Sequence, residues 1–121
     1  MRRCLVVDDA RVVRKVARKI FEDLGFTVEE AADGQEAVTA AQAHLPEVML
    51  LDWNMPVMSG IECLTAIRGL PLAIQPRIIM CTTENEIEKI TRALTAGADE
   101  YIMKPFDSDI LRAKLEQVGL L

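Results

Sequence analysis

Short apolar runs rich in branched side chains alternate along the chain with longer stretches in which apolar residues recur at helical spacing. The short runs have the length and composition of buried β-strands. They lie at residues 4–7, 27–31, 48–51, 77–81 and 101–103. The pattern therefore predicts five strands.

The longer stretches predict a helix after each strand. Between the first two strands, apolar residues from Val13 to Leu24 recur at i, i+3, i+4, i+7, i+8 and i+11, and Gly25 is suited to end that helix. Residues 33–44 and 107–118 also place their apolar residues on one face. These segments are predicted to be the first, second and fifth helices.

Two further helices are indicated by their start signals. Ser59 followed by Glu62, and Thr83 followed by Glu86, have capping-box spacing ahead of apolar repeats. The chain thus reads as five strand and helix pairs with short connections. That alternation predicts a parallel sheet with helices on both faces, the doubly wound α/β class.

The length of 121 residues fits one domain, which we expect to span residues 1–121 without a second, attached domain. The Met1 start and the plausible final helix favour a stand-alone protein over a domain excised from a longer DNA-binding protein. In a doubly wound sheet the functional crevice lies outside the carboxyl ends of the strands. The residues at those ends are therefore the candidates for chemistry.

Composition excludes several classes of function. Fourteen basic against 19 acidic residues give a net charge of −5, the wrong sign for direct nucleic-acid binding. No apolar stretch approaches the ~20 residues that a membrane-spanning helix needs. Cys4, Cys63 and Cys81 have no paired spacing, which favours a reduced cytoplasmic protein, and the single histidine, His44, leaves little material for Ser/His or Cys/His catalysis.

Three carboxylates follow two of the predicted strands. Asp8 and Asp9 come directly after the first strand, and Asp52 follows the third. An isolated aspartate at position 8 or 9 is more often a helix N-cap. Three gathered carboxylates, however, would repel each other by roughly 4 kcal/mol per pair at 4 Å and an effective dielectric near 20. A hard divalent cation such as Mg²⁺, which favours carboxylate ligands and substrate phosphate, would relieve that repulsion.

Two other strand ends carry polar residues. Thr82 and Thr83 follow the fourth strand and Lys104 follows the fifth. Alone, Lys104 would usually be a solvated surface lysine and Thr82 an ordinary strand residue. Beside a carboxylate cluster, the Lys104 ammonium can neutralise phosphoryl oxygens, and Thr82 can donate a hydroxyl hydrogen bond.

Taken together, these segments resemble the receiver domain of two-component response regulators. The resemblance rests on the aspartate pair at 8 and 9, LLDWNMPVMSG at 50–60, MCTTE at 80–84 and YIMKPF at 101–106, and it covers the whole chain. Its nearest familiar pattern is that of the CheY-like chemotaxis receivers. The resemblance implies a flavodoxin-like sheet with strand order 2-1-3-4-5.

The resemblance also implies the phosphoryl-transfer roles. Asp52 would be the phosphorylated residue, and Asp8, Asp9 and the backbone carbonyl of Asn54 would complete a Mg²⁺ site. A carboxylate is already a nucleophile, and the phosphoryl transition state mainly demands alignment and charge stabilisation. The chain is therefore expected to be a phosphoacceptor switch rather than an enzyme, with a histidine kinase or a histidine phosphotransfer protein as donor.

A second set of implied roles concerns signalling. Lys104, Thr82 and the backbone of Thr83 would bind the phosphoryl group, and Thr82 with Tyr101 would form the switch. Pro105 would follow a cis peptide bond. Phosphorylation would then change the face of the fourth helix, fifth strand and fifth helix, which would bind a downstream protein.

Some positions depart from the common receiver pattern or stay open. Ser59 stands where many receivers have aspartate, and Thr83 stands where a small residue is usual. Trp53 is expected to lie partly exposed at the rim of the site. The first helix carries a basic outer face that is either solvated or a docking surface; its members are Arg11, Arg14, Lys15, Arg18 and Lys19.

Other functions share parts of this pattern. A phosphatase of the haloacid dehalogenase type also forms an aspartyl phosphate, but it needs a second aspartate where this chain has Asn54. A flavodoxin-like cofactor carrier would need a phosphate-cradling glycine loop, and no GxGxxG is present. Asn54, Glu84 and Tyr101 match the chemotaxis pattern, so chemotaxis is the first expectation for the process.

Overall fold

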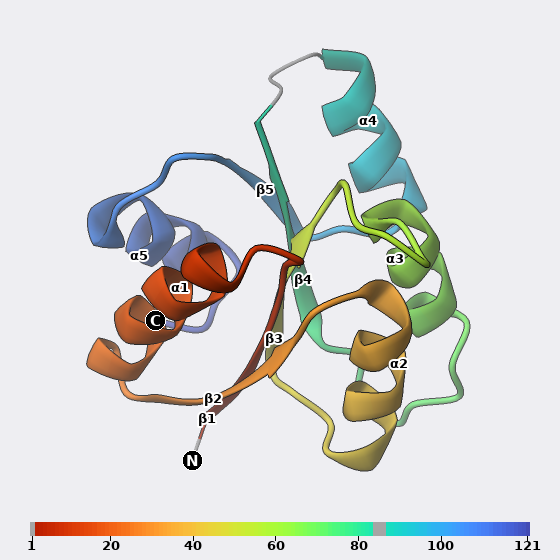
Figure 1. The fold of residues 1–121 in the computed structure, drawn as a ribbon, viewed down its shortest axis with the longest axis horizontal. Coiled ribbons are helices and arrows are strands. Elements are labelled where there is room, and N and C mark those ends of the chain that lie inside the picture. The colour runs from red at the N-terminus through yellow and green to blue at the C-terminus, as the bar shows by residue number, and fades with distance from the viewer. Residues whose placement is uncertain (1, 84–86) are drawn as a thin grey trace.

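The computed structural model describes residues 2–83 and 87–121 as one parallel five-stranded sheet with helices on both faces (Figure 1). The strands are ordered β2-β1-β3-β4-β5, as expected. The elements in chain order are β1 (Arg2–Val7), α1 (Arg11–Asp23), β2 (Phe26–Ala31), α2 (Gly34–Ala43), β3 (Val48–Asp52), α3 (Gly60–Arg68), β4 (Arg77–Thr82), α4 (Ile87–Ala96), β5 (Glu100–Met103) and α5 (Ser108–Gln117).

Two apolar layers hold the helices on the sheet. Side chains alternate across each strand, so neighbouring residues enter opposite layers. One layer packs against α2, α3 and α4, and its buried strand residues are Leu5, Val7, Ala31, Met49, Leu51, Ile78 and Met80. The other packs against α1 and α5, and its buried strand residues are Cys4, Val6, Phe26, Val28, Val48, Leu50, Ile79, Cys81 and Ile102. Because both faces are covered, the central strands are almost uninterruptedly apolar.

The sequence signals for helix ends are confirmed where the structure describes them. Ser59 caps α3 through a complete capping box: its Oγ accepts from the Glu62 amide at 3.2 Å, and the Ser59 amide donates to Glu62 Oε1 at 3.0 Å. Gly25, at φ +93°, follows the end of α1. Two residues used in these predictions lie outside the described residues. They are Glu84, one of the matches to the chemotaxis pattern, and Glu86, the second member of the other predicted capping box.

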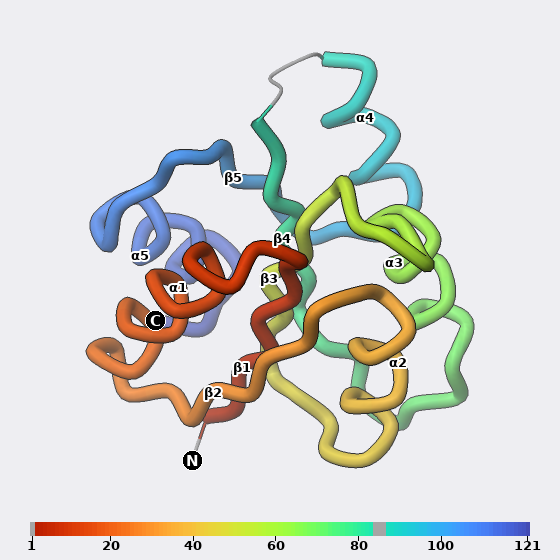
Figure 2. The backbone as a smooth tube through the Cα atoms, viewed as in Figure 1, coloured from red at the N-terminus to blue at the C-terminus, as the bar shows by residue number. Residues whose placement is uncertain are grey.

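The strands extend one or two residues beyond the predicted ranges. In particular, β3 ends at Asp52 and β4 ends at Thr82, so these two residues are the last of their strands rather than the first of a loop. Strand pairing aligns Asp52 with Cys81, one position before Thr82. The chain leaves β1, β3 and β4 at the same edge of the sheet (Figure 2). No described helix is both long and apolar enough to cross a bilayer.

The loop between β3 and α3 contains an unfavourable backbone conformation. Val57 has φ +68°, in the left-handed region, and is 81% exposed. A β-branched side chain is an outlier there, because its Cβ crowds the backbone. Since the exposed side chain gains little from packing, Val57 costs stability that the rest of the fold offsets.

Replacing Val57 by asparagine, which tolerates the left-handed region, is therefore expected to stabilise the protein by about 1 kcal/mol. Urea unfolding followed by circular dichroism measures this. Val12→Asn is the matched control, because Val12 is similarly exposed but lies in a helix, where asparagine is less favourable. Equal or lower stability of Val57→Asn would show that the loop carries no such strain.

Candidate functional site

Lys104 joins two buried aspartates at the carboxyl edge of the sheet. Its Nζ lies 2.7 Å from Asp8 Oδ2 and 2.9 Å from Asp52 Oδ1. Asp8 is 3% exposed and Asp52 is 6% exposed, whereas Lys104 is half-buried. Asp8 directly follows β1, Asp52 ends β3 and Lys104 directly follows β5, which confirms that these strand ends meet. The peptide bond from Lys104 to Pro105 is cis.

Asp9 adds a third, exposed carboxylate to the pair. One oxygen each from Asp8, Asp9 and Asp52 lies within 4.8 Å of the others. Lys104 offsets one of the three negative charges, so two remain, which is the charge that one divalent cation neutralises. Closely spaced carboxylate oxygens at a partly open edge suit Mg²⁺, which keeps some of its waters. The donor set therefore fits a Mg²⁺ site.

Burial and neighbouring charges shift the proton equilibria of this cluster. Burial raises the pKa of the Asp52 carboxyl; the Lys104 hydrogen bond opposes this, and the charges of Asp8 and Asp9 add to it. At Lys104, burial acts to lower the pKa, but hydrogen bonds to Asp8 and Asp52 outweigh it and raise the pKa above its ordinary value. Lys104 is thus a fixed cation beside a carboxylate whose charge is unfavourable without a further cation.

The turn after β1 presents both aspartates without using either as the helix cap. The N-cap of α1 is Ala10, which has no capping side chain. Asp8 Oδ1 instead accepts from the Ala10 amide at 2.8 Å, and the Asp8 amide donates to the Ala31 carbonyl at 3.1 Å. The ordinary N-cap interpretation of these aspartates is therefore wrong.

The loop after β3 is pressed against the backbone of Asp52. A Cβ on Gly60 would lie 2.2 Å from the Asp52 carbonyl oxygen, a contact that excludes every other residue type. The Gly60 amide donates to the Trp53 carbonyl at 2.9 Å, and the Trp53 amide donates to Cys81 at 3.0 Å. The sequence showed a glycine after Ser59, but not that its missing side chain positions β3, the strand that ends at Asp52. Asn54 is exposed in the same loop.

The expectation for Trp53 is wrong. Its side chain is only 8% exposed and packs in the apolar layer under α2, α3 and α4. The Lys89 ammonium of α4 lies 5.8 Å from the ring centroid. Strand alternation accounts for this, because the side chain of Trp53 lies on the same face of the sheet as that of Leu51, and the side chain of Asp52 lies on the opposite face. The indole therefore faces α4 rather than the carboxylates.

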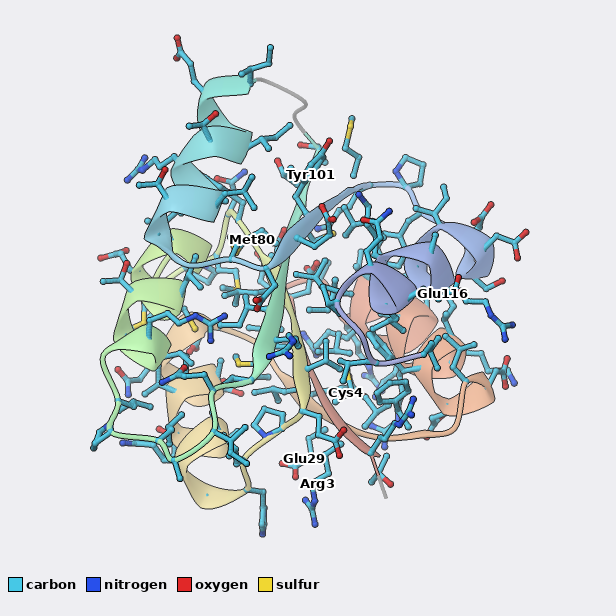
Figure 3. The ribbon with its side chains drawn as sticks, turned by 180° about the vertical axis from the view of Figure 1, so that it is seen from behind. Arg3, Cys4, Glu29, Met80, Tyr101 and Glu116 are labelled. Carbon is cyan, nitrogen blue, oxygen red and sulfur yellow. The ribbon has the colours of Figure 1, made fainter. Side chains whose placement is uncertain are left out.

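Thr82 and Tyr101 lie on that same face of the sheet. Pairing aligns Met80 with Tyr101 and Thr82 with Met103, so Thr82 and Tyr101 are diagonal neighbours. Thr82 is buried, and Tyr101 is half-buried under the Lys114 ammonium, 4.5 Å from its ring centroid. Figure 3 shows Tyr101 above Met80, toward the site end of the sheet. Thr83 is exposed at the strand end.

Most of the basic face of α1 is paired rather than simply solvated. Arg14, Lys15 and Arg18 all contact Glu30 of β2, and Lys19 contacts Asp23. The Glu30 contacts could not be predicted from the sequence, because they require β2 to lie beside α1.

Comparison with known proteins adds independent information. Residues 4–116 match the family model described as the response regulator receiver domain. The chain is 35% identical over 115 residues to chemotaxis protein CheY of Pseudomonas aeruginosa, covering 94% of this chain and 93% of that protein. It is 38% identical over 116 residues to chemotaxis protein CheY1 of Helicobacter pylori, covering 94% of each. The structure of Vibrio cholerae chemotaxis protein CheY4 superposes with a TM-score of 0.92 at 37% identity, covering 98% of both chains.

The raised pKa of Asp52 predicts how stability depends on pH in the absence of metal. An acid whose pKa is raised by folding destabilises the folded state once it is ionised. Asp52→Asn is therefore expected to be more stable than the wild type at neutral pH, by on the order of 1 kcal/mol. The difference should shrink as the pH is lowered from neutral toward about pH 4, because the folded carboxyl takes up its proton before the unfolded one does.

Urea unfolding with a chelator at both pH values measures this difference. Asp23→Asn, which alters an exposed aspartate paired with Lys19, is the control and should give no gain in stability. A less stable Asp52→Asn protein at neutral pH would mean that Lys104 compensates the buried charge fully.

Proposed function

Since the chain belongs to the response regulator receiver family and is a phosphoacceptor switch of phosphorelay signalling, we propose that Asp52 accepts the phosphoryl group. The observation that carries this assignment is the contact of Lys104 with both Asp8 and Asp52 inside a cluster of three carboxylates. Asp52 is the last residue of the central strand β3, which lies between β1 and β4, and it pairs with Cys81 of β4.

The chemistry requires alignment more than proton transfer. A carboxylate oxygen of Asp52 attacks phosphorus, a phosphorus–oxygen bond forms, and the bond from phosphorus to the donor's imidazole nitrogen breaks. Asp8, Asp9, Asp52 and the backbone carbonyl of Asn54 would hold Mg²⁺. When bound, the ion supplies positive charge that stabilises the phosphoryl oxygens. Asp52 needs no general base, because its carboxylate is itself the nucleophile.

Lys104 then changes its partner. Before phosphorylation its ammonium bridges Asp8 and Asp52. Once Asp52 carries the phosphoryl group as an acyl phosphate, its carboxylate loses its charge, and the phosphoryl oxygens become new strong acceptors for the ammonium beside Asp8. The ammonium binds one of them, and the backbone amide of Thr83 and the hydroxyl of Thr82 bind others. The burial of Thr82 at the strand end supports this role.

The conformational change at Thr82 is transmitted to the surface through Tyr101. Movement of the Thr82 hydroxyl toward the phosphoryl group vacates space on the sheet face that it shares with Tyr101. The tyrosine ring turns into that space, and α4 adjusts with it. The weak attachment of α4 supports this coupling, since Ala93 is its one fully buried residue among those described. Phosphorylation thus shifts the population of two surface arrangements.

The surface of α4, β5 and α5 is the proposed docking site for the downstream protein. It exposes large apolar side chains that a partner can bury. These are Ile87, Leu94, Met103 and Ile110.

The phosphodonor is proposed to be a histidine kinase or a histidine phosphotransfer protein that approaches over α1. Val12 and Val16 of α1 are 75% and 52% exposed, close to Asp9 in sequence. A shallow groove of about 230 Å³ joins them to the lysine of the site; its lining residues are Val12, Val13, Val16, Lys104, Pro105 and Phe106. The names of the relatives from P. aeruginosa and H. pylori support chemotaxis as the process.

Incubation with Mg²⁺ and acetyl phosphate is expected to add one phosphoryl group to the wild-type protein and none to Asp52→Asn. Intact-mass measurement decides this. Asp9→Ala should need much more Mg²⁺ to reach the same modification, because it removes one of the cation's carboxylates. An equal gain in mass in the wild type and Asp52→Asn would place the phosphoryl group elsewhere.

Thr82→Ala is expected to accept the phosphoryl group but to lose most of its conformational response. The response is the set of amide chemical-shift changes in α4 on addition of beryllofluoride and Mg²⁺. Thr82→Ser, which keeps the hydroxyl, should restore it, and Thr83→Ala, which keeps the backbone amide, should respond like the wild type. A full response in Thr82→Ala would reduce Thr82 to a strand residue.

A further inference from the structure

The Glu30 carboxylate of β2 binds three cationic side chains of α1 and is not part of the cluster of Asp8, Asp9 and Asp52. Its side chain is 12% exposed. Its Oε1 accepts from Arg14 Nε at 3.1 Å, and its Oε2 accepts from Lys15 Nζ at 2.8 Å and Arg18 Nη1 at 2.7 Å. Partial burial alone would raise the pKa of Glu30, but the hydrogen bonds from Lys15, Arg18 and Arg14 outweigh it and lower the pKa to about 2. Glu30 is therefore a permanent anion at physiological pH.

Arg14 differs from the other two cations because it also reaches the site. Its Nη1 donates to the backbone carbonyl of Asp8 at 2.7 Å, while its Nε is held by Glu30. The side chain is only 16% exposed. A planar guanidinium can make both contacts at once in a fixed geometry, which a lysine ammonium cannot reproduce. Lys15 binds Glu30, and Arg18 binds Glu30 and Glu22. Among the hydrogen bonds of the described residues, neither side chain donates to the Asp8 carbonyl.

The carbonyl that Arg14 holds belongs to the peptide joining Asp8 to Asp9. The Asp8 side chain has its own restraints, from Lys104 and the Ala10 amide. The Asp9 carboxylate is exposed and has no hydrogen bond with the described residues. Its place within 4.8 Å of the other carboxylates therefore depends on the orientation of its backbone. Rotation of the Asp8–Asp9 peptide would move Asp9 away from the cluster.

We propose that Arg14, anchored by Glu30, is a positioning residue that fixes the Asp8–Asp9 peptide and so holds Asp9 ready to bind Mg²⁺. The inference rests on the proposed Mg²⁺ site and adds two residues that touch neither the ion nor the phosphoryl group. Groups that orient metal ligands commonly affect metal affinity by about 10-fold or more when they are removed. Because Asp9 is a single, exposed ligand that is held only through its backbone, we expect an effect at or below the lower end of that range.

The sign of the effect separates positioning from simple electrostatics. Arg14→Met removes a positive charge near an anionic site, so a purely electrostatic effect would tighten Mg²⁺ binding. Loss of positioning would weaken it. Calorimetric titration of the metal-free protein with Mg²⁺ is expected to show affinity about 3- to 10-fold weaker in Arg14→Met. Arg18→Met, which removes an equal charge and one contact with Glu30, made at Oε2, but nothing from the turn, should bind with unchanged or tighter affinity.

Conservative variants separate geometry from charge. Arg14→Lys keeps the positive charge but cannot span Glu30 and the Asp8 carbonyl, so it should weaken Mg²⁺ binding as Arg14→Met does. Glu30→Gln releases the anchor and should act in the same direction. In the metal-free protein, the amide chemical shift of Asp9 should move in Arg14→Lys and stay in place in Arg18→Met. If Arg14→Met fails to fold in a thermal melt, Arg14→Lys and Glu30→Gln carry the test.

The outcomes distinguish this inference from the proposed function. Absence of saturable Mg²⁺ binding in the wild type, or equal binding in Asp9→Ala, would overturn the Mg²⁺ site itself. Normal binding in the wild type, with unchanged or tighter affinity in Arg14→Met and Arg14→Lys, would overturn the positioning role alone. Equal weakening in Arg14→Met and Arg18→Met would also overturn it, because the effect would then come from Glu30 and α1 in general.

Discussion

Mutual repulsion of three carboxylates, only partly relieved by Lys104, is the constraint around which this edge of the molecule is built. Asp8 and Asp52 are buried and bridged by one ammonium, and Asp9 adds a further charge within 4.8 Å. Such a cluster persists only on a rigid support, because a softer loop would let the charges move apart. The central strands β1 and β3, covered on both faces, provide that support.

Strand alternation divides the site between two sides of the sheet. Asp8, Asp52 and Lys104 follow the side that packs against α1 and α5, whereas Thr82, Tyr101 and the indole of Trp53 follow the side of α4. The carboxylate cluster and the residues proposed to respond to it therefore occupy opposite sides of one sheet. Thr82 belongs to the α4 side but is the last residue of β4, at the edge where the carboxylates gather. In the proposed switch, a short displacement of its hydroxyl alters packing under α4 without disturbing the carboxylates.

The sequence alone determined the elements and the place of the chemistry. A period of two or 3.6 residues records which side of a strand or helix is buried, so the five strands and most helix ends could be predicted to within two residues. The capping box of Ser59 and Glu62 needs only local spacing. Because parallel strands all end at one edge, Asp8, Asp52 and Lys104 could be placed together without knowledge of a single contact.

Only the tertiary structure decided how that edge is held. Glu30 and Arg14 are 16 residues apart, and their contact exists because β2 pairs with β1 directly beside α1. The need for glycine at position 60 arises from a backbone 2.2 Å from where a Cβ would lie. Trp53 looked exposed from its place at a strand end, yet α4 covers it. Each depends on the distance between segments far apart in the chain, and periodicity within one segment carries no information about that distance.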